Sequence, residues 1–70
     1  MVLNIVKLKE YIEASGMKQK FISEKANIPE AKLSLILNGK RKCEVGEYAS
    51  ICGVLRVPLE KFVTPEKEVV

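Results

Sequence analysis

A break in the apolar pattern of residues 18–39 constrains the fold more than any other feature of the sequence. Apolar residues recur at helical spacing up to Ala26, and Asn27 then supplies the residue type that, after glycine, best tolerates a left-handed turn. Pro29 can begin a second helix because its missing N–H is not needed there, and Asn38, followed by glycine, should end that helix. Two short helices joined by a turn of about three to four residues have the geometry of a helix-turn-helix.

The remaining sequence shows the same three- and four-residue apolar spacing, without a repeat, a linker or a low-complexity stretch. We therefore predict an all-α fold, a compact domain of five helices that includes the helix-turn-helix. The expected helices cover residues 4–15, 18–26, 29–38, 44–55 and 58–63. The domain should comprise residues 1–63, and residues 64–70, which have no helical stripe, should form a flexible tail. The inner faces of the last two helices should contain Val45, Tyr48, Ile51, Cys52, Leu55, Leu59 and Phe62.

The two cysteines, Cys43 and Cys52, are expected to be reduced thiols. If the chain between them is helical, their Cα atoms lie roughly 13 Å apart, which is beyond the limit of about 7 Å for a disulfide. With no histidine in the chain, two cysteines do not make a zinc site. We expect Cys52 in the core and Cys43 as a loop thiol, and we expect neither a metal nor a cofactor.

The composition also argues against catalysis and against a membrane location. There is no histidine, no serine nucleophile motif and no glycine loop that could hold a phosphate, so the sequence offers nothing from which to build an active site. No apolar run approaches the roughly 18 residues of a membrane span, and the N-terminus lacks the basic start and long apolar stretch of a signal peptide. These features predict a cytoplasmic protein that is not an enzyme.

Basic residues are concentrated in the middle of the chain. Residues 18–42 contain seven basic and two acidic residues, whereas the flanking segments are neutral or acidic, and the whole chain has a net charge of +3. A basic segment that coincides with the predicted helix-turn-helix indicates a surface that binds a polyanion. A solvated charged surface would have the same composition, so charge alone leaves both interpretations open.

The second helix of the predicted motif, residues 29–38, has an exposed side that could enter the major groove of DNA. That side should contain the base-contacting residues Glu30, Ala31, Lys32, Ser34 and Leu35. Phosphates run along both sides of the groove, where they could be contacted by the flanking basic residues Lys18, Lys20, Lys40, Arg41 and Lys42. For the expected base-contacting residues, the alternative is an ordinary exposed helix face, with Leu35 belonging to the core. For Lys40, Arg41 and Lys42, the alternative is a solvated loop.

The stretch GMKQKFISEKANIPEAKLSLILNGKRK, continued by ICGVLRVPLEKF, resembles the XRE family, which includes the Cro proteins and the lambda-like repressors. The resemblance covers about residues 3–63. It implies a five-helix lambda-repressor-like fold and sequence-specific binding of double-stranded DNA. It also implies that Gln19 contacts a phosphate and that Asn38, in the Asn-Gly that ends the recognition helix, meets the DNA backbone.

The chain departs from the family pattern at core and turn positions. Many relatives pair a buried arginine on the first helix with a glutamate late in the third, where this chain has Ile12 and Leu37. We expect these two residues to pack together, because an apolar pair can replace a buried ion pair without loss of stability. Relatives often have glycine at the positions of Asn27 and Arg56, and arginine is the less comfortable of the two in a left-handed conformation.

The base-reading positions are atypical as well. Glu30 could accept a hydrogen bond from cytosine N4 or could stabilise its helix through the helix dipole. Ala31 and Leu35 could contact thymine methyl groups, which predicts a largely apolar readout. Phe21 occupies a position that is usually polar in the family, and it could either cover the first helix or contact another protein.

The resemblance implies a Cro-like transcriptional repressor of a prokaryote or a phage, with operator DNA as its partner. One domain reads about four to six base pairs, too few to select one site among roughly 10⁶ in a genome, so we expect a homodimer at least on DNA. The alternative is an antitoxin or anti-repressor that uses the same fold mainly to bind a protein partner. The sequence alone does not separate these functions.

Overall fold

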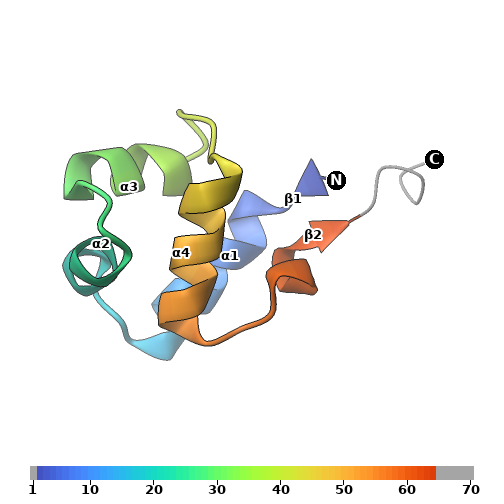
Figure 1. The fold of residues 1–70 in the computed structure, drawn as a ribbon, viewed down its shortest axis with the longest axis horizontal. Helices are drawn as coiled ribbons and strands as arrows, with labels where there is room; N and C mark the ends of the chain where they lie inside the picture. Colours follow the sequence, from blue (N-terminus) through green and yellow to red (C-terminus); the bar gives the residue numbers. More distant parts are fainter. Residues whose placement is uncertain (1, 65–70) are drawn as a thin grey trace.

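The computed structural model describes residues 2–64, which form four α-helices, one 3₁₀ helix and a short pair of strands (Figure 1). Each α-helix begins and ends within one residue of its predicted bounds, and the predicted helical class is confirmed. In chain order the elements are β1 (Val2–Leu3), α1 (Ile5–Ser15), α2 (Gln19–Ala26), α3 (Glu30–Leu37), α4 (Val45–Leu55), η1 (Leu59–Phe62) and β2 (Val63–Thr64).

The helix ends lie where local backbone chemistry places them. The Asn4 side chain accepts a hydrogen bond from a backbone N–H of the first turn of α1 at 3.1 Å. Gly16 (φ +79°) and Asn27 (φ +58°) adopt left-handed conformations that end α1 and α2. Pro29 is the N-cap of α3 rather than its first residue, and its carbonyl already accepts the Leu33 N–H at 2.9 Å.

The fifth predicted helix is wrong in type and length. Residues 58–63 do not form an α-helix; the chain forms the four-residue 3₁₀ helix η1, in which the Lys61 N–H donates to the Pro58 carbonyl at 3.2 Å. A segment this short, started by a proline, makes a tight i→i+3 turn more readily than an α-helical turn. Its apolar residues follow the same spacing in both helix types, so the sequence pattern did not distinguish them.

The strands β1 and β2 were not expected from the sequence, because two residues are too few to show an alternating pattern. They lie side by side in an antiparallel ladder, in which Val2 pairs with Thr64 and Leu3 with Val63 (Figure 1). Thr64, the expected start of the flexible tail, is therefore part of β2. The other residues of the expected tail, 65–70, lie outside the described residues.

A contiguous apolar core joins all four α-helices and η1. Ile12 and Leu37, the expected apolar pair, are each 2% exposed and belong to this core, where α1 packs against α3. No polar partner is needed at these two positions, since both side chains are apolar. The buried members of the core are Leu8, Ile12, Ile22, Ala26, Ile28, Leu33, Leu37, Tyr48, Ile51, Cys52, Leu55 and Phe62.

Two residues expected on inner faces are exposed instead. Val45 is 79% exposed because it is the first residue of α4 and lies on the turn that extends past the core. Leu59 is 51% exposed, and its backbone carbonyl accepts a hydrogen bond from the Tyr48 hydroxyl. This bond turns the backbone of η1 toward the core and leaves the Leu59 side chain at the surface.

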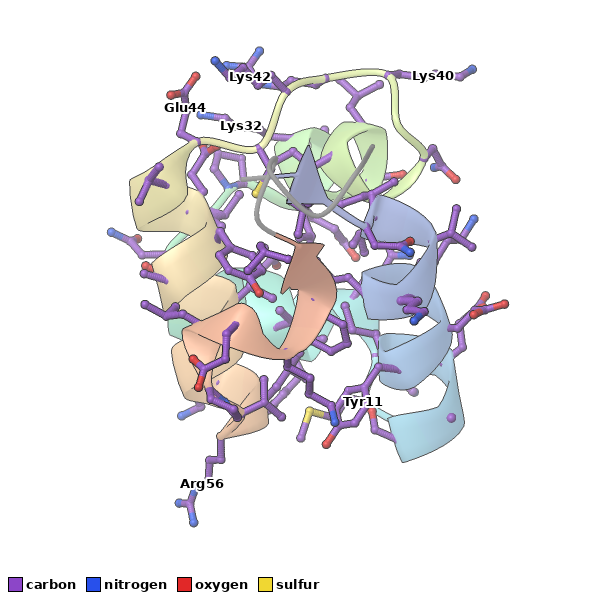
Figure 2. The ribbon with its side chains drawn as sticks, turned by 90° about the vertical axis from the view of Figure 1, so that its right-hand side faces the viewer. Tyr11, Lys32, Lys40, Lys42, Glu44 and Arg56 are labelled. Atoms are coloured by element: carbon purple, nitrogen blue, oxygen red, sulfur yellow. The ribbon has the colours of Figure 1, made fainter. Side chains whose placement is uncertain are left out.

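Arg56 ends α4 in a left-handed conformation (φ +58°), which confirms the conformation expected at this position. Its side chain is exposed and extends away from the domain (Figure 2).

Arg56→Gly should therefore raise the free energy of unfolding by about 0.5–1 kcal/mol, because glycine adopts this conformation without a Cβ clash. Urea denaturation measures the change, with Arg56→Ala as the control that removes the charge but keeps the Cβ. Equal stabilisation by both variants would show that charge, and not backbone strain, is the cause.

Candidate nucleic-acid interface

The turn between α2 and α3 is closed by backbone hydrogen bonds around a small buried residue. Ser23 is 6% exposed, and its hydroxyl donates to the Lys20 carbonyl at 2.8 Å, which satisfies the buried oxygen. The Ser23 carbonyl accepts the Ile28 N–H at 2.9 Å, and the Ile28 side chain is buried beneath the turn. The small side chain lets α2 and α3 pack against each other, so the predicted helix-turn-helix is present.

The recognition helix α3 has one buried side and one exposed side. Its buried residues are Leu33, Ile36 and Leu37. At about 100° per residue, the direction opposite to these three passes through Ala31, Leu35 and Asn38. The residues at the borders of this exposed face are Glu30 and Ser34 on one side and Lys32 on the other.

Lys32, expected to contact bases, is held at the border of this face by an ion pair with Glu47 of α4. Glu47 also accepts the Glu44 N–H at 3.0 Å, and this bond fixes the carboxylate at the start of α4. The hydrogen bond from Lys32 is the main reason that the pKa of Glu47 lies below its usual value. The Lys32 ammonium is thus directed toward α4, and it must leave Glu47 before it can reach a base.

Both polar atoms of the Asn38 side-chain amide are hydrogen-bonded. Its Oδ1 accepts a hydrogen bond from Lys9 Nζ at 2.8 Å, and its Nδ2 donates to the Ser34 carbonyl at 2.9 Å. Lys9 lies on α1, and it was not among the expected site residues because nothing local to the first helix indicates a contact with a residue 29 positions away. The contact brings an additional cation to the end of α3.

The start of α2 forms one flank of the exposed face. Lys18 is the N-cap residue of α2, and Lys20 follows in its first turn; both side chains are exposed. Gln19, between them, is half-buried. These three residues, which we expect to contact phosphate, therefore lie together at the N-terminus of α2. The free backbone N–H groups of that helix end also favour an anion.

The loop between α3 and α4 forms the other flank. Gly39 (φ +72°) and the Lys40 N–H, which donates to the Leu35 carbonyl at 2.9 Å, turn the chain away from α3. Lys40, Arg41 and Lys42 are exposed on this loop. Figure 2 shows Lys40 and Lys42 at the end of the domain beside α3, opposite to the end that carries Arg56.

Both cysteines are free thiols that are at least partly buried. Cys52 is buried in the core, Cys43 is half-buried in the loop before α4, and both are free. Burial, together with the nearby Glu47 carboxylate, raises the pKa of Cys43 to about 11, so this thiol stays protonated near neutral pH.

Within residues 2–64, no group of histidine, cysteine and acidic side chains could hold a metal ion. None of its helices combines the length and the apolar character that crossing a membrane requires.

A comparison with protein families matches residues 7–68 to the Cro/C1-type HTH DNA-binding domain. The chain belongs to this family. The match covers the helix-turn-helix and the helices around it, and it confirms the resemblance to XRE-type proteins. No curated protein and no solved structure matches the chain significantly.

This Cro/C1-type domain presents its predicted site as one face with two flanks. Four of the five residues expected to contact bases, Glu30, Ala31, Ser34 and Leu35, lie on or beside the exposed side of α3. The fifth, Lys32, is paired with α4. The basic residues expected at phosphates lie on both flanks of that helix.

Proposed function

We propose that this Cro/C1-type domain is a sequence-specific repressor that inserts α3 into the major groove of a double-stranded operator. The observation that carries the proposal is the exposed face of α3 between two cationic flanks, which matches the arrangement of base edges between two phosphate backbones. In this proposal the protein acts in the cytoplasm of a prokaryote, or on the operator of a phage, and binds as a homodimer on DNA.

Phosphate contacts are assigned to both flanks of the recognition helix. They position the domain on the groove without reading the sequence. We assign them to Lys18, Gln19, Lys20, Asn38, Lys40, Arg41 and Lys42. The Lys9–Asn38 hydrogen bond supports the assignment of Asn38, because it adds a positive charge at the point where α3 would meet the backbone.

Base contacts are assigned mainly to the apolar centre of the face, Ala31 and Leu35. Leu35 is 44% exposed although it is a large apolar residue. Lys32 is paired with Glu47, and the Asn38 amide is already hydrogen-bonded, so few free donors remain on this face. Thymine methyl groups are the apolar feature of the major groove, so the proposed operator has thymines opposite this centre.

The test begins with selection of the bound sequence from a random pool of double-stranded DNA. Each selected thymine is then replaced by uracil, which removes only the 5-methyl group. Loss of one methyl contact should weaken binding about fourfold, since burial of one such carbon contributes about 0.8 kcal/mol. In Leu35→Ala the same replacement should have almost no effect at the thymine that Leu35 contacts.

The matched control is Val6→Ala, which shortens an apolar side chain on α1 that is 61% exposed. This variant should keep the full response to uracil. A selected operator whose thymines can all be replaced without effect would contradict the apolar readout. Failure to select any sequence would contradict sequence-specific binding itself.

A second candidate function is binding to a protein partner, as an antitoxin or anti-repressor does. The observation that favours it is Phe21, an aromatic residue of α2 that is 45% exposed and has the Lys25 ammonium over its ring, 5.8 Å from the centroid. An exposed aromatic residue with cations around it is typical of a protein-binding site. Binding of the selected DNA by the purified chain, with no second protein present, would favour the repressor.

A further inference from the structure

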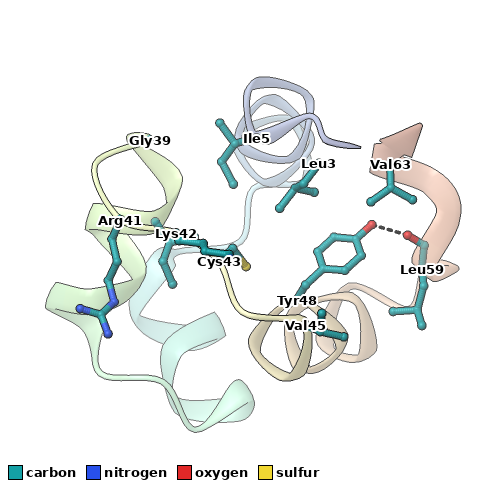
Figure 3. A pocket seen from close by; sticks show the side chains of 11 residues that line it. Leu3, Ile5, Gly39, Arg41, Lys42, Cys43, Val45, Tyr48, Leu59 and Val63 are labelled. Atoms are coloured by element: carbon teal, nitrogen blue, oxygen red, sulfur yellow. Dashed lines mark hydrogen bonds between the residues drawn. The ribbon is translucent and has the colours of Figure 1, made fainter. Parts of the chain in front are cut away.

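Glu47 of α4 interacts with two cations that we assign to contacts with DNA. The hydrogen bond from Lys32 is the main cause of the lowered pKa of Glu47, and the charge of Arg41 adds to it. Arg41 extends from the loop before α4 and is directed away from Tyr48, which lines an apolar groove (Figure 3). One acidic side chain therefore acts on a base-reading position and on a phosphate-binding position.

The Glu47 carboxylate has a second bond that fixes its position independently of Lys32. Glu47 is the third residue of α4, and its side chain accepts the Glu44 N–H at 3.0 Å in a capping box. This bond holds the carboxylate at the first turn of α4, and its low pKa means that it is ionised at neutral pH. Lys32 is thus paired with a charged acceptor that α4 itself holds in place.

The ion pair is largely shielded from solvent. The exposed fraction of the side chain is 31% for Lys32 and only 15% for Glu47. Salt screens a partly buried pair much less than an exposed one, so the pair persists at physiological ionic strength. If Lys32 turned toward a base, the Glu47 carboxylate would be left as an uncompensated and partly buried charge, which is unfavourable.

A free lysine at the border of the recognition helix would favour guanine, which presents the acceptors O6 and N7 in the major groove. We infer that Glu47 is a positioning residue that determines base specificity, because it holds Lys32 against α4 and so prevents the reading of guanine by this lysine. The inference rests on the proposed function. It accounts for a recognition helix that carries a lysine and yet reads DNA through its apolar centre, Ala31 and Leu35.

The experiment repeats the selection from random double-stranded DNA with Glu47→Gln. Glutamine also serves as the third residue of a capping box, so the variant keeps the acceptor for the Glu44 N–H and loses only the charge. The freed Lys32 should add a preference for guanine at one base pair of each half-site, a preference that the wild type lacks. Glu47→Gln should bind an operator with this guanine at least about fivefold more tightly than the wild-type operator.

Two further variants show whether Lys32 is responsible. Lys32→Gln/Glu47→Gln should lose the new preference for guanine, because no ammonium remains to donate to the base. Lys32→Gln alone should select the same sequence as the wild type, since Lys32 does not read a base there. This variant tests the same inference without a change in α4.

Glu44→Gln is the matched control, because it removes the same charge at the N-cap of α4 and leaves the Lys32–Glu47 pair intact. It should strengthen binding slightly and equally on all sequences, since it removes only a repulsion from phosphates. An equally uniform gain in Glu47→Gln, without a new guanine, would overturn the inference. A wild-type preference for guanine that Lys32→Gln abolishes would also overturn it, because Lys32 would then leave Glu47 on DNA. If the wild type selects no sequence, the proposed function has failed and the inference falls with it.

Discussion

Leu37→Glu should destabilise the domain by at least about 3 kcal/mol, because it buries an unpaired charge in the core. Leu37 is 2% exposed and belongs to the hydrophobic core. For a domain of this size each kilocalorie per mole lowers the melting temperature by about 4–8 °C, so the variant should melt at least about 12 °C below the wild type. Thermal unfolding followed by circular dichroism measures the change.

Leu35→Glu is the matched control, since it makes the same change two positions away on the same helix. Leu35 is 44% exposed, so the free energy of unfolding of Leu35→Glu should differ from that of the wild type by less than about 0.5 kcal/mol. The double variant Ile12→Arg/Leu37→Glu restores the arginine and glutamate that many relatives have, and it should recover part of the loss. A melting temperature of Leu37→Glu equal to that of the wild type would mean that Leu37 can turn to the surface.

Neutralising the α3–α4 loop should weaken DNA binding and make it much less sensitive to salt. Each phosphate contact contributes about −0.9 to the slope of log affinity against log salt concentration, so Lys40→Gln/Arg41→Gln/Lys42→Gln should flatten the slope by about two to three units. The loss of affinity at low salt should be similar on all DNA sequences, because phosphate contacts do not read bases. Titration of the operator and of unrelated DNA at several salt concentrations gives both quantities.

The control for this effect uses cations at the other end of the domain. Arg56 extends from that end (Figure 2), and Lys61 lies over the ring of Tyr11, 5.2 Å from its centroid, in the same region. Arg56→Gln/Lys61→Gln should leave the slope nearly unchanged. Lys40→Gln/Lys42→Gln, which lowers the net charge by the same amount, should flatten the slope by about two units. Equal slopes for the two double variants would show that overall charge, and not the position of the loop, controls the salt dependence.

The fold was predictable where one residue and its neighbours decide the backbone conformation. Asn27 and Gly16 end helices because they tolerate positive φ, and Asn4 begins one because its side chain reaches a free N–H. These are local effects that the sequence displays directly. The pairing of β1 with β2 was not predicted, since it depends on the two ends of the described chain meeting. The type of η1 was not predicted because its apolar residues follow the same spacing in both helix types.

The candidate site was predictable as a set of residues but not as a geometry. The exposed face of α3 and its basic flanks follow from helical periodicity and from the basic composition of residues 18–42. Whether a side chain on that face is free depends on contacts from other helices. Lys32 is paired with Glu47 of α4, and Asn38 with Lys9 of α1, and neither partner can be identified from spacing along the chain.

The sequence by itself therefore determined the helical class, the helix-turn-helix and the family, because each depends on apolar period and on turn residues that act over a few positions. Only the tertiary structure decided which polar groups of the recognition helix are already engaged and which apolar residues remain outside the core. Val45 and Leu59 have the spacing of core residues, yet α4 begins past the core and the Tyr48 hydroxyl fixes the backbone of η1. Burial depends on where each helix meets its neighbours, and that relation is absent from any single segment of sequence.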